Sequence, residues 1–562
     1  MKAMMKYGML PMILCAAVLL SGCQQEESTT AESSVAAVDA DYDTSSAVTI
    51  SLEGDTAVCS SDAVSIDGGR ITVLEEGTYI FTGTLNDGQV VVNAADDDKV
   101  QIVLNDATIT SETSAAIYCL EADKVFLTLE NGTENCLANG GEFVAVDDNN
   151  IDAAIFSKTD LTLNGSGSMI VTSPAGHGVV SKDELTISGG SYQITAASHG
   201  FTGKDSVAIA GGNFVITSGK DGIHAENADD AAKGCLYIED GSFVIDAKGD
   251  AISATGALQI DDGSYTLTAG GGSEAVTMKS GDMMRHFDQP GTDDTKESAS
   301  SDSTTSCKGI KTDGALTVNG GTYTLDTADD ALHAGGDVTI SGGEWVIRTG
   351  DDGIHSDCAV VIQMGTFSIP YCYEGIEGQT VTIEDGTFEI TSNDDGMNAA
   401  GGADSSGTSY GFGRQDQFAV SEDCFITING GVITIVSDGD SIDSNGDLTI
   451  NGGTLNLTCN GNGNTAIDTN GTYTNNGGSV TTNDGSENGT GGKNGGRNGG
   501  KNGGSFDDGG ERPDKGERPA GGERPDKGER PAGGERPADG ENPDRGQKPV
   551  DDEESVEYEK QF

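Results

Sequence analysis

A glycine followed two residues later by an aromatic side chain recurs along the middle of the chain with a period of about 22 residues. Such self-similarity is the signature of a solenoid, in which each repeat packs mainly on its neighbours. Gly431 and Gly453 continue the same frame without the aromatic residue. The pairs are Gly190 with Tyr192, Gly212 with Phe214, Gly241 with Phe243, Gly263 with Tyr265, Gly321 with Tyr323, Gly343 with Trp345, Gly365 with Phe367 and Gly386 with Phe388.

Each repeat contains short runs of alternating apolar and polar residues, such as 265–267, 338–340 and 388–390, and no helical periodicity. Two or three short strands in a turn of about 22 residues predict an all-β fold, a single-stranded parallel β-helix with turns about 4.8 Å apart. Stacked turns place like residues above like. We therefore expect an interior aromatic ladder that includes Trp345; a sugar-stacking role for Trp345 is the less favoured interpretation.

The repeat predicts a β-helix domain over residues 48–482, with looser spacing in its first turns, which we interpret as the start of the solenoid and a cap. Insertions at 281–306 and 401–422 interrupt turns at corners, where a solenoid tolerates loops that often bind ligands. From 483 to 562 the chain consists of Gly, Asn, Pro and charged residues with almost nothing apolar to bury. This composition predicts a disordered tail that acts as a spacer.

The first 22 residues have the pattern of a secretory signal, with lysines before an apolar stretch and small residues before Cys23. Leu20-Ser-Gly-Cys23 resembles the bacterial lipobox, so we expect lipidation at Cys23, a polar tether over 23–47 and a position on the extracellular face of the membrane. Plain secretion is the alternative. The lipid would be the only membrane contact.

Eleven cysteines minus Cys15 and Cys23 leave nine, with no C-x-x-C motif, so a disulfide framework or a zinc site is not expected. Cys358 and Cys424 each precede a repeat glycine by seven residues. This shared position predicts thiols that face the interior as small hydrophobic groups.

Acidic side chains outnumber basic ones by 92 to 31, which gives a formal charge of −61. A negative charge of this size excludes nucleic acid as a natural partner and makes divalent cations the first ligands to expect. We expect a monomer.

The acids concentrate at one corner of the repeat, where Asp330, Asp352, Glu374 and Asp395 follow one another at 22, 22 and 21 residues. Carboxylates about 4.8 Å apart repel by about 3 to 4 kcal/mol at an effective dielectric constant near 20, so their charge must be neutralised. Calcium binds six to eight oxygens at about 2.3 to 2.6 Å, which suits acids on adjacent turns. The predicted Ca²⁺ ligands are Asp221, Asp250, Asp329, Asp330, Asp351, Asp352, Glu374, Glu377, Asp394, Asp395, Asp440 and Asp443.

Two alternatives remain open at this corner. The carboxylates could be Asp-Gly turns that cap backbone amides, without a metal. Histidines 224, 333 and 355 could instead indicate a transition metal, although hydrogen-bonded corner histidines are the favoured interpretation.

A second ladder is positive, because Lys158, Lys182 and Lys204 recur at 24 and 22 residues beside acids. These lysines most simply relieve repulsion between carboxylates. Contact with uronate carboxylates is the alternative interpretation. The residues that we expect to contact a ligand are Lys182, Lys204, Lys308, Lys311, Tyr371 and Tyr373.

A series of short motifs in order over residues 48–480 resembles the bacterial carbohydrate-binding domain-containing protein family, with a pectate-lyase-like right-handed β-helix. The resemblance implies calcium-dependent binding of plant cell-wall polysaccharide, cellulose or acidic pectic sugars, without cleavage. Near 459–478 the chain has fewer apolar residues than the family pattern. The motifs span 152–158, 176–183, 203–207, 308–311, 329–333, 351–355, 373–377 and 439–446.

Two functions of different classes follow. A binding module would present a long face to an extended polysaccharide, with calcium joining acidic protein to acidic sugar and with exposed aromatics such as Tyr371 stacking on the rings. A polysaccharide lyase would need calcium and a basic side chain close to it, for which Lys308, Lys311 and Arg285 are candidates. Acids spread over at least seven turns favour binding. A surface adhesin stiffened by calcium is a third possibility.

Overall fold

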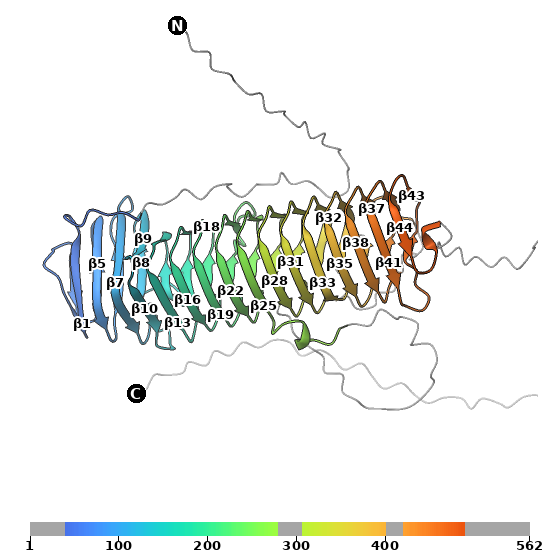
Figure 1. Ribbon diagram of the computed structural model, residues 1–562. Coiled ribbons are helices and arrows are strands. Elements are labelled where there is room, and N and C mark those ends of the chain that lie inside the picture. The colour runs from blue at the N-terminus through green and yellow to red at the C-terminus, as the bar shows by residue number, and fades with distance from the viewer. Residues whose placement is uncertain (1–39, 146, 279–305, 401–419, 489–562) are drawn as a thin grey trace, which may run out of the picture. The chain divides into compact units, whose positions relative to one another are not determined.

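Successive turns of the repeat pair through backbone hydrogen bonds as parallel strands in a computed structural model that describes residues 40–145, 147–278, 306–400 and 420–488. In regular turns, residues 22 apart are paired, as Tyr192 is with Phe214. The structure confirms the parallel β-helix. Figure 1 shows the strands following one another from β1 to the last turns. Every described residue lies in one structural unit, which spans Met1–Gly495.

Each turn contains three strands, which build three parallel sheets. We call them the corner sheet, the threonine sheet and the aromatic sheet, in the order in which the chain visits them within a turn. The strands of the corner sheet are β4 (Arg70–Val73), β6 (Gln89–Asn93), β8 (Ile117–Glu121), β11 (Ala153–Ser157), β14 (His177–Ser181), β17 (Phe201–Gly203), β20 (Ile223–Ala225), β23 (Ile252–Ala254), β26 (Ile310–Thr312), β29 (Leu332–Ala334), the first parts of β32 (Ile354–Ile362) and β34 (Ile376–Ile383), β36 (Met397–Ala399), β39 (Ile442–Ser444) and β42 (Ile467–Thr469).

The other two sheets follow in each turn. The threonine sheet contains β9 (Lys124–Leu129), β12 (Asp160–Gly165), β15 (Glu184–Ile187), β18 (Ser206–Ile209), β21 (Cys235–Ile238), β24 (Leu258–Ile260), β27 (Leu316–Val318), β30 (Val338–Ile340), the second parts of β32 and β34, β37 (Phe425–Ile428), β40 (Asp447–Ile450) and β43 (Tyr473–Asn475). The aromatic sheet contains β10 (Glu134–Asn139), β13 (Ser168–Ser173), β16 (Ser191–Ala196), β19 (Asn213–Ser218), β22 (Ser242–Ala247), β25 (Ser264–Ala269), β28 (Thr322–Thr327), β31 (Glu344–Thr349), β33 (Thr366–Cys372), β35 (Thr387–Ser392), β38 (Val432–Ser437), β41 (Thr454–Cys459) and β44 (Ser479–Thr482).

The first turns are less regular. Here β1 (Val48–Gly54), β5 (Gly77–Leu85) and β7 (Lys99–Ser111) pair in parallel, and the long β7 contacts both β9 and β10. Two antiparallel pairs, β1 with β2 (Ala57–Val58) and β3 (Val64–Asp67) with β4, lie at this end.

Helical structure in the described ranges is limited to two 3₁₀ turns, η1 (Ser273–Ala275) and η4 (Ser486–Asn488). No helix among these residues has the length and apolar character needed to cross a membrane. The predicted signal and lipidation site lie outside the described residues, as do most of the tether, the tail and both insertions. Residues 483–488 of the predicted tail are described and include η4.

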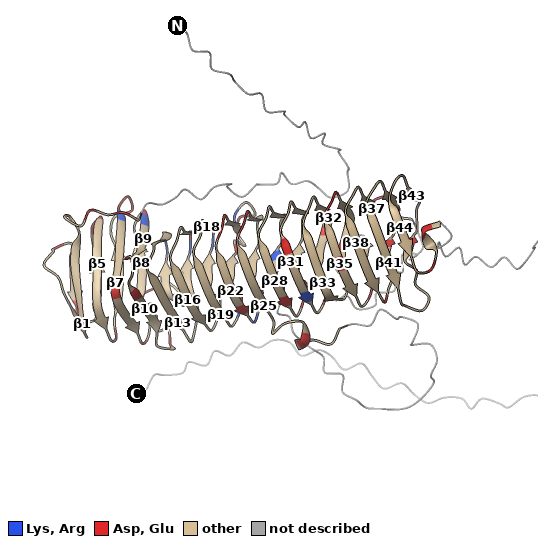
Figure 2. Ribbon diagram, in the orientation of Figure 1, with Lys and Arg blue, Asp and Glu red and all other residues tan. Residues whose placement is uncertain are grey.

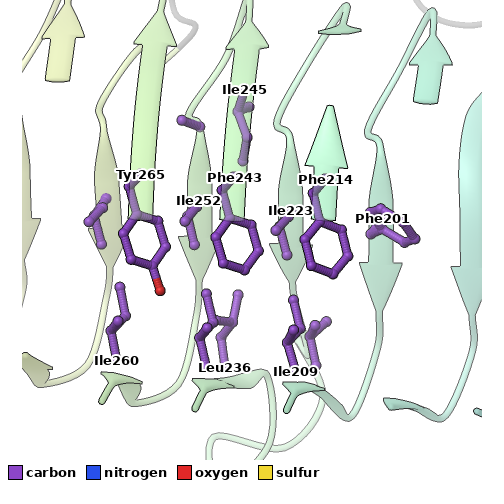
Figure 3. Close-up of a cluster of buried hydrophobic side chains, with 14 of the residues drawn as sticks. Phe201, Ile209, Phe214, Ile223, Leu236, Phe243, Ile245, Ile252, Ile260 and Tyr265 are labelled. Atoms are coloured by element: carbon purple, nitrogen blue, oxygen red, sulfur yellow. The ribbon is translucent and has the colours of Figure 1, made fainter. Parts of the chain in front are cut away.

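Aromatic rings stack inside the solenoid, as the repeat predicted. Neighbouring rings from Tyr192 to Phe388 have centroids 3.7 to 5.8 Å apart and planes within 16° of parallel. Figure 3 shows part of this ladder, with Phe214, Phe243 and Tyr265 in a row. Trp345 is only 2% exposed and stacks between Tyr323 and Phe367, so it is a core residue and cannot reach a sugar.

The repeat glycines allow this ladder to form. Gly365 has a φ of 139°, and a Cβ atom there would lie 2.7 Å from the ring of Phe367. A side chain at this turn would therefore collide with the aromatic residue that follows it.

The nine cysteines of the described part are free thiols. Cys424 is buried, as predicted, but Cys358 is only partly buried, with its Sγ 3.7 Å from the carbonyl oxygen of Gly335. The prediction for Cys358 was wrong because β32 continues from the corner sheet into the threonine sheet at this residue, with a register shift between Ser356 and Ala359.

We expect Trp345→Ala to lower the free energy of unfolding by about 3 to 5 kcal/mol, because it opens a cavity in a stacked interior. The neighbouring Val346→Ala is the control, since Val346 points outward and is 46% exposed; its effect should stay within about 0.5 kcal/mol. Denaturant unfolding of both variants measures the difference. Equal losses would contradict the inward orientation of the ladder.

Candidate functional site

The predicted acids lie at the corner between the aromatic sheet and the corner sheet. Strand pairing brings into vertical register the residues that lie two positions before most corner strands, a set that we call the corner column. From β14, where the member is the first residue of the strand, to β42, the members are His177, His199, Asp221, Asp250, Lys308, Asp330, Asp352, Glu374, Asp395, Asp440 and Thr465. Figure 2 shows that the strands themselves carry few charged residues.

Most carboxylates of the corner column accept a hydrogen bond from the backbone N–H of the next residue in the column. Oδ1 of Asp221 accepts from Asp250 N at 2.9 Å, and Oδ1 of Asp352 accepts from Glu374 N at 3.1 Å. Asp395 does the same for Asp440 at 2.6 Å. The capping alternative is therefore correct for one oxygen of each of these acids, and it does not account for the second oxygen.

A second column runs beside the first, formed by the middle residue of each corner strand. We call it the face column, because the middle residues of strands such as β26 and β29 are more exposed than their neighbours. It contains His224, Ser253, Lys311, His333, His355, Glu377, Asn398, Asp443 and Asp468. Three more predicted acids, Asp329, Asp351 and Asp394, lie one residue before the corner column.

At its N-terminal end the site is rich in histidine. The rings of His177, His199 and His224 stack with centroids 5.1 and 4.3 Å apart. Oδ2 of Asp221 lies 3.4 Å from His199 Nδ1 and 2.9 Å from His224 Nδ1. Burial lowers the pKa of His177 to about 3. Burial alone would raise the pKa of Asp221, but hydrogen bonds with His199 and His224 hold it below its usual value.

In the middle of the column a lysine replaces an acid. Lys308 is 8% exposed, and its Nζ lies 2.6 Å from Asp330 Oδ2 and 2.9 Å from Asp329 Oδ1. Burial opposes the charge of Lys308, but the two aspartates raise its pKa above the usual value. Lys308 was predicted to contact a ligand; the structure shows that it is a buried counter-ion of the acids.

Two turns beyond Lys308, His355 lies among carboxylates. Its Nδ1 is 2.9 Å from Glu377 Oε2 and 3.3 Å from Asp352 Oδ2, and its side chain is 1% exposed. Burial would lower the pKa of His355, but the bonds to Asp352 and Glu377 raise it to about 12. This histidine therefore supplies one positive charge to the acids around it.

Beyond His355, among the residues described, the acids outnumber basic groups. Burial, followed by the charges of Asp352 and Glu377, raises the pKa of Glu374 well above its usual value. Burial and Asp443 do the same for Asp395. Burial, with Asp440 and Asp468, raises the pKa of Asp443 to about 7. These carboxylates are close enough to resist ionisation together.

An amide lies among these acids with an unsatisfied oxygen. Asn398 is 8% exposed and its Nδ2 donates to Glu374 Oε2 at 3.0 Å. Its Oδ1 is buried and has no hydrogen-bond partner. A buried acceptor without a donor costs about 1 to 3 kcal/mol unless something else binds it.

The remaining predicted ligand residues lie apart from one another. Lys182 lies over the ring of Phe156 at 5.4 Å, and Lys204 pairs with Asp229 at 2.8 Å, at turns between the corner and threonine sheets. Lys311 belongs to the face column, 3.7 Å from Asp313. Lys182 and Lys204 are therefore not part of the acidic corner.

The two tyrosines lie near the acids. Tyr373 is hydrogen-bonded to Asp394, and burial with this bond raises its pKa above the usual value. Tyr371 is partly exposed beside β31, where the guanidinium of Arg348 lies 5.1 Å from its ring.

Sequence reasoning missed His199, Arg348 and Asn398 as members of the site. His199 was detectable, because it precedes Asp221 by 22 residues. The meeting of Arg348 with Tyr371 depends on a bulge in β33, where the register shifts, and no spacing in the sequence indicates it.

A parallel β-helix with two polar columns at one corner is thus the scaffold of the site. The family described as "Carbohydrate-binding domain-containing protein" matches residues 67–353 and 351–506, more than half of the chain. The chain belongs to this family, and membership supports carbohydrate binding as its function.

A relative with the same description from Acetivibrio thermocellus is 35% identical over 137 residues, which are 24% of this chain and 48% of the relative. The match thus spans about half the length of that relative. A solved structure described as the polysaccharide lyase-like protein from C. thermocellum, a gadolinium derivative, is 26% identical. It covers 52% of this chain and 96% of its own, with a TM-score of 0.38, which is too low to transfer fold or function.

We expect Lys308→Met to lower the free energy of unfolding by about 3 to 5 kcal/mol at neutral pH, because the variant leaves Asp330 buried without its ammonium partner. Lys311→Met is the matched control, since Lys311 faces outward and its nearest acid is 3.7 Å away; it should change stability by less than about 0.5 kcal/mol. Denaturant unfolding measures both. If Lys308→Met matches the control, Lys308 does not neutralise the column.

Proposed function

We propose that this protein binds an extended acidic polysaccharide, of the polygalacturonate type, without cleaving it, through calcium held at the C-terminal half of the two columns. The observation that carries the proposal is the surplus of buried carboxylates beyond His355. Burial and the charges of neighbouring acids raise the pKa of these groups, so a bound cation would stabilise carboxylates that otherwise resist ionisation.

The residues of this half fit calcium by their donor chemistry. Glu377, Asn398 and Asp443 follow one another in the face column, with Glu374 and Asp395 beside them in the corner column. All five offer oxygen atoms, the donors that calcium prefers. The buried Oδ1 of Asn398, which has no partner, is the type of amide oxygen that completes a calcium shell.

We propose that these five residues would hold the ion and that the ion would neutralise both the protein's acids and the sugar's carboxylate. Asp221 has two imidazole neighbours, and Asp330 has Lys308, so neither belongs to the proposed calcium site. Glu377 has one oxygen, Oε2, beside His355 at 2.9 Å and would offer the ion its other oxygen. Of the twelve acids that the sequence predicts as calcium ligands, the proposed site keeps Glu374, Glu377, Asp395 and Asp443, and it adds Asn398.

The same corner offers groups for the sugar itself. Arg348 and Tyr371 lie side by side on the outer face of the aromatic sheet, and the chain reaches Glu374 three residues after Tyr371. A guanidinium binds a carboxylate, and a tyrosine ring stacks on a pyranose face. Cellulose offers no carboxylate to the metal or to Arg348, so the site favours a uronate polymer.

A polysaccharide lyase is the second candidate. Lys308 would be a poor base, because it is buried and paired with two aspartates. Lys311 in the face column is partly exposed and would have to abstract the proton. Arg285 lies outside the described residues.

We also propose that the protein is attached to the cell surface through a lipid on Cys23, a residue that lies outside the described ranges.

We expect the calcium-free protein to lose stability as pH rises from about 4 to about 7. The pKa of Asp443 is raised from 3.8 to about 7 in the folded state, so in this window the folded protein holds a proton that the unfolded chain has released. Calcium should restore the melting temperature at pH 8. Glu377→Gln combined with Asp443→Asn should remove this response, while Glu389→Gln, at an exposed acid of β35, should keep it.

A melting temperature that is the same with calcium and with chelator at pH 8 would contradict the metal site. A calcium response that survives in the double variant would place the ion elsewhere in the protein.

Retention on immobilised polygalacturonate tests the sugar surface. We expect retention to require calcium, and Arg348→Ala and Tyr371→Ala each to weaken it by about tenfold, because each removes about 1 to 2 kcal/mol of contact. Val346→Ala, on the same strand as Arg348, is the control. Absorbance of unsaturated uronides is followed in the same samples: a steady rise would favour the lyase, and stabilisation by calcium without retention would favour the adhesin.

A further inference from the structure

The histidine-rich end of the site has different chemistry from the acidic end. One ligand atom from each of His199, Asp221 and His224 lies within 4.8 Å of the other two. Two of the three atoms are imidazole nitrogens, which calcium does not favour but which suit zinc, nickel, cobalt or copper. The three side chains are 12 to 14% exposed, so an ion from solvent can reach them.

The hydrogen bonds bring electron-rich atoms together at this point. His224 Nε2 is 3.1 Å from Glu226 Oε2, so the Nε2–H donates to that carboxylate. The other nitrogen, Nδ1, then turns its lone pair toward Asp221 Oδ2 at 2.9 Å. His199 Nδ1 accepts the N–H of Asp221 at 3.2 Å, a hydrogen bond that an ion at this nitrogen would replace, and it lies 3.4 Å from the same Oδ2. Such an arrangement requires a cation, either a second proton on His224 or a metal ion.

The distances fit a metal ion. Zinc binds nitrogen and oxygen at about 2.0 to 2.2 Å, so adjacent ligand atoms lie about 2.8 to 3.6 Å apart, from octahedral to tetrahedral geometry. The Asp221 Oδ2 atom is 2.9 and 3.4 Å from the two imidazole nitrogens. Ser253 Oγ, 2.8 Å from Asp221 Oδ2 and 2.7 Å from His224 Nδ1, lies at the same place.

The pair of Glu226 with His224 adds an independent feature. Histidines that bind metals usually donate their other N–H to a carboxylate, which fixes the tautomer and orients the ring. Glu226 has this position relative to His224.

Two other clusters that contain histidine are weaker candidates. Asp330, His333 and His355 also converge, but the Nζ of Lys308 is 2.6 Å from Asp330 Oδ2 and already provides the positive charge there. Asp352, His355 and Glu377 converge as well, but only one of their three ligand atoms is an imidazole nitrogen. No lysine or arginine has an ion pair of this kind with Asp221 among the described residues.

We propose that His199, Asp221 and His224 bind one divalent transition-metal ion of the zinc class, with Ser253 or water completing its shell and Glu226 orienting His224. This site is separate from the proposed calcium site, which lies several turns further along the solenoid. The two ends of one corner would thus select cations of different hardness.

Titration of the full chain with Co²⁺, with calcium in excess to occupy oxygen-rich sites, tests the proposal. We expect one Co²⁺ per chain with the visible absorption of a nitrogen-ligated ion, displaced by Zn²⁺. His199→Gln and His224→Gln should each weaken binding at least about 100-fold, and Glu226→Gln about 10-fold. Melting temperatures without metal identify any variant that fails to fold.

Two controls separate this site from its neighbours. His333→Gln removes a histidine from the cluster around Asp330 and should leave Co²⁺ binding unchanged. Glu377→Gln combined with Asp443→Asn should affect calcium binding alone. The proposal would be overturned if the wild-type chain showed no saturable Co²⁺ binding, or if both His199→Gln and His224→Gln bound Co²⁺ as tightly as the wild type. A protonated His224 would then be the cation at this place.

Discussion

The hydrogen-bonded pairing of each turn with the next is the constraint on which this structure depends. It holds equivalent residues about 4.8 Å apart, so whatever occupies one position of the repeat is stacked on its own kind. Inside the solenoid this stacking is favourable, because the aromatic rings from Tyr192 to Phe388 exclude water and contact each other face to face. At the corner it brings charges together, and there it must be offset.

The corner meets this requirement in three different ways along its length. Toward the N-terminus, two histidine side chains lie against Asp221. In the middle, the buried ammonium of Lys308 neutralises Asp330. Beyond His355 the described residues include too few basic groups, and the acids raise the pKa of one another. One repeated backbone therefore supports three electrostatic environments, and the proposed metal sites correspond to the two that lack a lysine.

This division connects the fold to carbohydrate binding. A rigid column of oxygen donors can hold a cation at a fixed place on a long surface, and Tyr371, with Arg348 beside it, lies on the strand that precedes Glu374. The surface is built by stacking alone, so changing the residues of one turn alters the local chemistry without altering the scaffold. Such independence is expected when each repeat contacts mainly its neighbours.

The sequence by itself determined the solenoid, its period and the vertical register of Asp330, Asp352 and Glu374, because a fixed spacing of 22 residues can only stack. It also placed Trp345 in the interior, from its position after the repeat glycine. The spacing also indicates the place of Lys308, which precedes Asp330 by 22 residues, but only the tertiary structure decided that its ammonium group is buried against Asp329 and Asp330. The structure alone also decided which carboxylate oxygen accepts a backbone N–H and which lies beside a lysine or histidine. That choice depends on side-chain orientation and burial, which the spacing of residues in the sequence does not indicate.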